Sequence, residues 1–168
     1  MSINIEIRRA KPSDYVGMQQ LFSDPAVIYG TMQLPYPSEE LWRERLEEPP
    51  LGLYLLLACD GDEVIGQITL ITHPQRPRRA HAAGIGLTVR SDYHGQGIGT
   101  RLLTEVLEMG EKWLNITRFE LEVFADNEAA IHIYKKLGFE IEGKHTKHAF
   151  RDGSYEDVYS MARLKNRD

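Results

Sequence analysis

The sequence has a single cysteine, Cys59, among 168 residues, which excludes an internal disulfide. The apolar neighbours of Cys59 indicate a buried thiol rather than a nucleophile. No apolar run approaches the ~18 residues that a membrane-spanning helix needs, and no charged-then-apolar leader opens the chain. These absences predict a cytoplasmic protein with no membrane segment.

An excess of basic residues is also lacking. The chain has 20 Lys and Arg against 25 Asp and Glu, a formal net charge of -5, which argues against nucleic acid as the main partner. His145 and His148 have no carboxylate or cysteine at ligand spacing, so we predict no metal site. The length, without repeats or a linker, predicts one domain over residues 1–168 that can bury a core.

A glycine-rich segment, His94–Arg101, follows the apolar run 85–89 and opens an amphipathic stretch that reaches about Leu114. A strand, a tight loop and a helix start in this order make an anion site, because the first amides of a helix lack internal partners and lie at the positive end of its dipole. Alternate glycines let a ligand approach the backbone closely. The segment therefore predicts a phosphate-bearing cofactor.

Two common phosphate motifs do not fit this loop. A dinucleotide fingerprint needs a third glycine at the position that Thr100 occupies. A P-loop needs a lysine directly after its last glycine, and no lysine follows any of these glycines.

Apolar periodicity, caps and turns predict the order β-α-α-β-β-β-α-β-α-β-β, an α/β fold with a mixed sheet flanked by helices. The expected strands lie at about 3–8, 53–59, 63–72, up to 89, from 118, and on both sides of a turn at 151–154. The expected helices lie at about 13–22, from 38 to the Pro49-Pro50 stop, at 97–114 and from 127.

A second motif follows the strand that begins at Arg118. From Asn127 to Phe139 the chain reads N-x-x-A-x-x-x-Y-x-x-x-G-F, with Asn127 at a helix start and Gly138 at its end. The glycine-rich loop fits [Q/R]-x-x-G-x-[G/A], except that His94 stands in the Arg or Gln position. Together these motifs resemble the GNAT family of acetyl-CoA-dependent N-acetyltransferases, over essentially the whole chain. The resemblance implies the GNAT fold, whose sheet is mixed but mostly antiparallel.

The resemblance also implies where acetyl-CoA binds. A bulge at Gly84 and Gly86 would let the strand edge bind the pantetheine arm through Leu87 and Val89. Arg101 is a charge partner for the pyrophosphate or a solvated helix residue, and Asn127 contacts the cofactor, caps its helix, or does both. The expected cofactor-binding residues are Leu87, Val89, His94, Gly95, Gln96, Gly97, Ile98, Gly99, Thr100, Arg101 and Asn127.

Tyr134 occupies the position of the family's general acid, which protonates the departing thiolate. Donation is only mildly uphill, since a thiol has an ordinary pKa near 8.5 and a phenol one near 10. The alternative is a tyrosine that simply packs its helix on the sheet.

The base is a separate question. Removing a proton from an alkyl ammonium of pKa about 10.4 at pH 7 costs roughly 4.6 kcal/mol, against about 1 kcal/mol for a peptide α-amine. Many family members place a carboxylate in the strand before the loop, where this chain has residues 84–87 and no acid. Glu122, twelve residues before Tyr134, resembles the glutamate of members that acetylate protein N-termini through water. Alternatives are a solvent-facing role for Glu122, the weaker Glu120 and, remotely, His81.

The loop over residues 29–37 is aromatic, apolar and free of acids, whereas a polyamine or aminoglycoside would need several carboxylates. It is either plain packing or the acceptor site, with Tyr29, Gln33 and Tyr36 as expected substrate residues. We therefore predict direct acetyl transfer, in a ternary complex, to a small-molecule primary amine, best an apolar or aromatic L-amino acid. The alternatives are a ribosomal-protein-type N-terminal acetyltransferase and a non-catalytic acyl-CoA sensor.

The basic cluster 75–79 could meet the 3′-phosphate of the cofactor, an anionic substrate, a partner subunit or only solvent. The sequence leaves the oligomeric state open, with a homodimer as one option.

Overall fold

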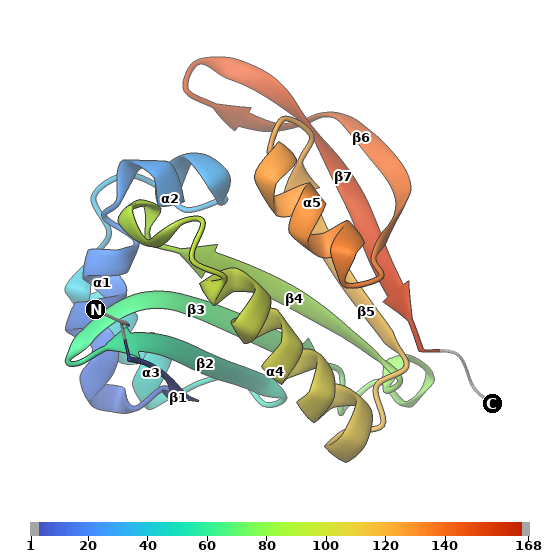
Figure 1. Ribbon diagram of the computed structural model, residues 1–168, viewed down its shortest axis with the longest axis horizontal. Coiled ribbons are helices and arrows are strands. Elements are labelled where there is room, and N and C mark those ends of the chain that lie inside the picture. The colour runs from blue at the N-terminus through green and yellow to red at the C-terminus, as the bar shows by residue number, and fades with distance from the viewer. Residues whose placement is uncertain (1–3, 166–168) are drawn as a thin grey trace.

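The computed structural model describes residues 4–165, which form one twisted sheet covered by helices (Figure 1). The sheet has seven strands in the order β1-β2-β3-β4-β5-β7-β6. Its strands are β1 (Ile5–Arg9), β2 (Leu53–Asp60), β3 (Glu63–Thr72), β4 (Ala82–Val89), β5 (Arg118–Phe124), β6 (Glu140–Arg151) and β7 (Ser154–Leu164). Among the strands of the described residues, only β4 and β5 pair in parallel. The expected mixed, mostly antiparallel α/β fold is confirmed.

The helices form two hydrophobic cores, one on each side of β2. The helices are α1 (Tyr15–Leu21), α2 (Pro25–Gly30), α3 (Glu39–Glu47), α4 (Ile98–Trp113) and α5 (Glu128–Lys136). Helices α4 and α5 lie over one face of the sheet, where they share a core with Ala58 and Phe119 (Figure 1). Helices α1, α2 and α3 share the second core with Leu57 and Cys59. The alternation of Leu57, Ala58 and Cys59 between cores follows from the two-residue period of a strand, and Cys59 is buried, as expected.

The segment between Phe22 and Ser38 differs from the expectation, because it contains helix α2. Asp24 caps this helix by accepting a hydrogen bond from the Ala26 amide at 2.9 Å, and Pro25 occupies its first turn. Six residues are too few to show apolar periodicity, which explains why the sequence pattern missed it. The helix expected at 13–22 begins as a 3₁₀ turn, Pro12–Asp14, before α1.

The sheet opens between its two parallel strands. Strands β4 and β5 pair only from Ala82 to Gly84, whereas β4 stays paired with β3 up to Val89. Within the described residues, the expected bulge at Gly84 and Gly86 is wrong, because the pairing of β3 with β4 has no register shift there. Gly86 instead makes room for a neighbour, since a Cβ on it would lie 2.8 Å from Thr69 Oγ1. The free edge of β4 arises from strand divergence.

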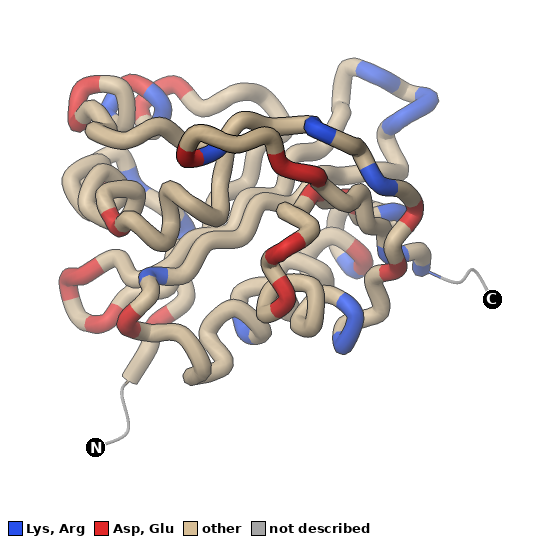
Figure 2. The backbone as a smooth tube through the Cα atoms, turned by 90° about the horizontal axis from the view of Figure 1, so that it is seen from above, with Lys and Arg blue, Asp and Glu red and all other residues tan. Residues whose placement is uncertain are grey.

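Charged residues of both signs are interspersed over the backbone (Figure 2). In the basic cluster 75–79, Arg79 donates to both oxygens of Glu120, at 3.0 and 2.8 Å. One guanidinium of the cluster, that of Arg79, is therefore already paired with a carboxylate on β5.

Gly110 lets α4 pack closely on the sheet, because an added Cβ would lie 2.7 Å from the Phe119 ring. We expect Gly110→Ala to lower the free energy of unfolding by ~1–3 kcal/mol through overpacking, although alanine favours a helix by ~1 kcal/mol. Urea denaturation followed by circular dichroism measures this change. Gly30→Ala is the matched control, since its Cβ would have no neighbour closer than 3.9 Å. A stabilised Gly110→Ala would contradict the close packing.

Candidate active site

Two cavities meet where β4 and β5 diverge. The first, here called the sheet cavity, has a volume of about 570 Å³ and lies between the open sheet and helices α1 and α3. The second, the loop cavity, has a volume of about 500 Å³ and lies between the glycine-rich loop and α5. Both are lined by Gly30, Thr31, Leu87, Thr88, Asn127, Ala130 and Tyr134. These shared residues show that the two cavities adjoin.

The glycine-rich loop presents backbone amides to the loop cavity. Gly95 and Gly97 have φ values of 75° and 77°, which a glycine adopts without strain. Gly97 precedes the first residue of α4, so the first amides of this helix point out of it without internal partners. The His94 ring lies 2.8 Å from the Val89 carbonyl oxygen through Nε2, which ties the loop to the end of β4. The arrangement can bind an anion at the positive end of the α4 dipole.

Most of the expected cofactor-binding residues lie together around this cavity. It is lined by Leu87, Val89, His94, Gly95, Gly97, Ile98, Gly99, Thr100 and Asn127. Gln96 and Arg101 are not among its described lining residues. Arg101 Nη2 donates to the Ile5 carbonyl at 3.2 Å, so this side chain is directed at β1. A pyrophosphate contact from Arg101 would require another rotamer.

Tyr134 lies at the junction of the two cavities. Helix α5 brings it there, and Asn127 starts this helix by accepting a hydrogen bond from the Ala130 amide at 3.2 Å. The residue is 6% exposed, and its ring packs 5.7 Å from that of Phe139. Burial raises the pKa of Tyr134 to about 12. The phenol is therefore protonated at any physiological pH.

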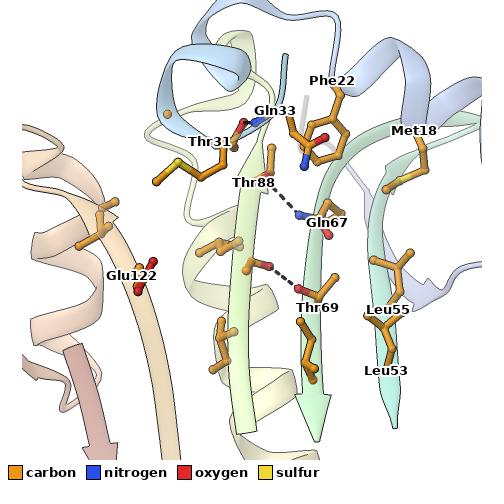
Figure 3. A pocket seen from close by; sticks show the side chains of 18 of the residues that line it. Met18, Phe22, Thr31, Gln33, Leu53, Leu55, Gln67, Thr69, Thr88 and Glu122 are labelled. Atoms are coloured by element: carbon orange, nitrogen blue, oxygen red, sulfur yellow. Dashed lines mark hydrogen bonds between the residues drawn. The ribbon is translucent and has the colours of Figure 1, made fainter. Parts of the chain in front are cut away.

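Glu122 is the candidate base that faces the sheet cavity (Figure 3). Its side chain is 54% exposed, and Oε2 lies 3.6 Å from His148 Nε2. Glu120, by contrast, is bound by Arg79 and Arg118. Burial alone would raise the pKa of Glu120, but hydrogen bonds from both arginines outweigh it and hold that pKa below its usual range. Neither Glu120 nor His81 is among the described residues that line the two cavities.

The floor of the sheet cavity carries polar groups that the sequence analysis missed. Gln67 Nε2 donates to Thr88 Oγ1 at 3.1 Å, and Thr69 Oγ1 donates to the Gly86 carbonyl at 3.4 Å (Figure 3). Gln67 and Thr69 occupy alternate positions of a strand that is otherwise mostly apolar. Two polar residues on one face of an apolar strand were the sequence signal for this polar part of the cavity, because a buried face carries polar side chains only where they find hydrogen-bond partners.

The remaining wall of the sheet cavity is largely apolar. Helices, loops and strands contribute Met18, Phe22, Met32, Trp42, Leu46, Leu53, Leu55, Ile71 and Ile85. Of the three expected substrate residues, Gln33 lines this cavity and the other two do not. Tyr36 is 99% exposed, and the Arg151 guanidinium covers the Tyr29 ring at 3.8 Å. The loop over residues 29–37 therefore contributes through Gly30, Thr31, Met32 and Gln33.

Neither a metal centre nor a membrane-spanning helix is found within residues 4–165. In this range no three His, Cys, Asp or Glu residues gather as a metal site would require. No helix in the same range combines the length and apolarity needed to cross a bilayer.

Known proteins of similar sequence show the family of this chain. The model of the acetyltransferase (GNAT) family matches residues 17–139. The L-amino acid N-acetyltransferase AaaT of Escherichia coli (strain K12) is 45% identical over 161 residues, which cover 96% of this chain and 98% of that protein. The spermidine N(1)-acetyltransferase of the same strain is 26% identical over 162 residues, which cover 94% of this chain and 84% of that protein.

Solved structures share the fold. A GNAT-family acetyltransferase from Streptococcus pneumoniae superimposes with a TM-score of 0.83 at 26% identity, over 96% of this chain and 100% of that one. A ribosomal-protein-S5-alanine acetyltransferase from Vibrio fischeri gives 0.84 at 22% identity, over 95% of this chain and 92% of that one. The second likeness is one of fold alone.

The buried phenol of Tyr134 makes stability fall with pH at the alkaline end. An unfolded tyrosine ionises near pKa 10, whereas folding holds the pKa of Tyr134 at about 12. The unfolded state then binds fewer protons, so the free energy of unfolding falls as pH rises through this window. We expect Tyr134→Phe to lack this part of the decline, at most ~2–3 kcal/mol.

Urea denaturation from about pH 8 to about pH 12 measures the effect. Tyr36→Phe makes the same substitution at an exposed position and should keep the decline of the unmodified protein. Equal slopes for all three proteins would contradict a buried, protonated Tyr134.

Proposed function

We infer that this chain, which belongs to the GNAT family of acetyltransferases and transfers the acetyl group of acetyl-CoA to an amine, acts on the α-amine of an apolar or aromatic L-amino acid. The observation that carries the proposal is the lining of the sheet cavity, which is mostly apolar and meets the loop cavity at Tyr134. The L-amino acid N-acetyltransferase AaaT aligns with this chain over 98% of its own length, which supports an L-amino acid as the acceptor.

The charge of the sheet cavity argues against a polyamine as acceptor. Spermidine and aminoglycosides carry several cations, and each buried cation needs a carboxylate partner. Among the described residues that line this cavity, Glu122 is the only acid. One carboxylate matches one amine, and apolar walls of residues such as Trp42 and Leu55 match an apolar side chain.

The loop cavity provides the matching site for acetyl-CoA. The amides of Gly97 to Thr100 would hold the pyrophosphate. The edge of β4 beyond Gly84 faces away from β3 and has no strand partner on β5, so it is open to the amide groups of the pantetheine arm. This path brings the thioester to Tyr134, where the acceptor cavity begins.

The proposed reaction is direct and has no covalent enzyme intermediate. Glu122 takes a proton from the acceptor ammonium, directly or through water, and the neutral amine attacks the thioester carbonyl. The tetrahedral adduct then collapses to an N-protonated amide and a thiolate, which takes the phenolic proton of Tyr134. The extra proton of the amide nitrogen passes to the Tyr134 phenolate, directly or through water, which restores the phenol. The raised pKa of Tyr134 makes this donation harder than it would be for an exposed phenol. The same dry surroundings also raise the pKa of a thiolate beside it, so the mismatch is partly offset.

A panel of acceptors tests the proposal, with thiol release from acetyl-CoA as the readout. We expect L-phenylalanine and L-leucine to give a much higher kcat/KM than spermidine, an aminoglycoside or short peptides. Turnover of peptides alone would identify a protein N-terminal acetyltransferase. No turnover of any amine, while acetyl-CoA still raises the melting temperature, would favour an acyl-CoA sensor.

Tyr134→Phe removes the proposed acid and keeps the ring that packs near Phe139. We expect it to lower kcat by about 10²- to 10⁴-fold, the usual contribution of general acid–base catalysis, with little change in acetyl-CoA affinity. Steady-state kinetics and calorimetric titration with acetyl-CoA measure these two quantities. Near-normal kcat would remove Tyr134 from the mechanism.

Glu122→Gln removes the proposed base. We expect a loss of kcat/KM that shrinks as pH rises, because the free amine becomes abundant and the base is then less needed. Glu120→Gln is the matched control, since Glu120 shares the strand but pairs with arginines. A pH-independent loss in Glu122→Gln would mean that Glu122 is not the base.

A further inference from the structure

Strand β6 has an irregularity beside the proposed base. It advances four residues from His145 to Ala149 while its partners on β7 advance two, from Val158 to Glu156. Lys147, inside this bulge, has a φ of 51°, a strained value for a residue with a side chain. Bulges next to active sites change the direction of side chains. A side chain in the bulge of β6 can therefore point toward the site.

The bulge is held in place by a contact with β7. The Lys147 amide donates to Asp157 Oδ1 at 2.8 Å, and Lys144 Nζ lies 3.3 Å from the other oxygen of the same carboxylate. Because these contacts offset the strain at Lys147, the bulge is a built feature of the hairpin.

The redirected side chain is that of His148. Strands β5 and β6 are not neighbours, because β7 lies between them. Two strand spacings of ~4.8 Å separate their backbones by about 10 Å, so two side chains meet across β7 only when both are aimed toward one another. His148 Nε2 nevertheless lies 3.6 Å from Glu122 Oε2. The bulge therefore brings an imidazole across β7 to the proposed base.

The titratable groups in contact with His148 come from β5 and from its own strand. Glu122 faces it from β5, and the His145 ring lies 5.1 Å away on its own strand. Asp157 of β7 is turned to the Lys147 amide and to Lys144. Within the part of the chain that the structure describes, Glu122 is the only carboxylate within 4.0 Å of a His148 ring nitrogen.

We propose that His148 receives the substrate proton from Glu122 and releases it to water. This step rests on the proposed role of Glu122 as base. The ammonium proton moves to Glu122, the carboxylic acid passes it to Nε2 of neutral His148, and the imidazolium loses a proton to solvent, which regenerates both groups. The His148 side chain is 38% exposed, which provides the contact with water. His148 acts through Glu122 and is thus a positioning residue.

The chemical advantage of the relay is that an imidazole is a stronger base than a carboxylate. An imidazole has an ordinary pKa of about 6.5 and a carboxyl one of about 4.3, so an imidazole holds a proton roughly 10²-fold better. The carboxylate of Glu122, once restored, also stabilises the imidazolium beside it. At 3.6 Å the pair is longer than a hydrogen bond, as is common before substrate binds and closes such contacts.

His148→Ala tests the proposal, with L-phenylalanine as acceptor or whichever amine of the panel is turned over. We expect kcat/KM to fall ~10-fold near neutral pH, less than for Glu122→Gln, and the loss to shrink as pH rises. Added imidazole should restore activity. His145→Ala is the matched control, since it removes the neighbouring ring and should be neither strongly impaired nor rescued.

The double variant separates this inference from the proposed function. If both residues lie on one proton path, Glu122→Gln with His148→Ala should be no slower than Glu122→Gln alone. A pH-independent, unrescued loss or additive effects would overturn the role of His148. Normal turnover in Glu122→Gln would instead overturn the base assignment.

A measurement without substrate tests the contact directly. In NMR spectra of the free protein, Glu122→Gln should move the resonances of the His148 ring, because the carboxylate 3.6 Å from Nε2 is lost. Glu120→Gln should leave those resonances in place. Unmoved His148 resonances in Glu122→Gln would exclude the contact.

Discussion

The divergence of β4 from β5 is the constraint on which the rest of the site depends. These strands pair from Ala82 to Gly84 and then part, which leaves one edge of β4 without a neighbouring strand among the described residues. Such an edge carries N–H and C=O groups that can take an added strand. The divergence also exposes a side chain of each strand to the sheet cavity, Leu87 on β4 and Glu122 on β5. Helix α5 then brings Tyr134 to the point where both cavities meet.

Solvent exposure differs between the two sides of this junction. Tyr134 is buried, and its phenol stays protonated, whereas the Glu122 side chain is about half exposed and faces His148. In the proposed reaction one proton must leave the amine and another must reach the thiolate. The exposed position suits Glu122, which must pass its proton on to solvent. The buried position suits Tyr134, which must keep its proton until the thiolate forms beside it.

Local chemistry made part of the site predictable. The Gly97 start of α4 and the Asn127 cap of α5 depend on a few adjacent residues, so their patterns could be recognised without the fold. Side-chain direction could not be recognised in the same way. Arg101 is four residues beyond Gly97, yet it is directed at Ile5, a residue from the other end of the chain. Tyr36 lies in the expected acceptor loop but is fully in solvent.

The sequence by itself determined the order of most elements, the glycine-rich loop and the position of Tyr134 on its helix, because each depends on neighbours a few residues apart. Only the tertiary structure decided which groups share a cavity. The Gln67–Thr88 pair joins residues of two strands, and the Glu122–His148 contact spans two strands separated by a third. Such contacts depend on strand register, divergence and a bulge, which are set by packing across the whole sheet and leave no periodic trace in the chain.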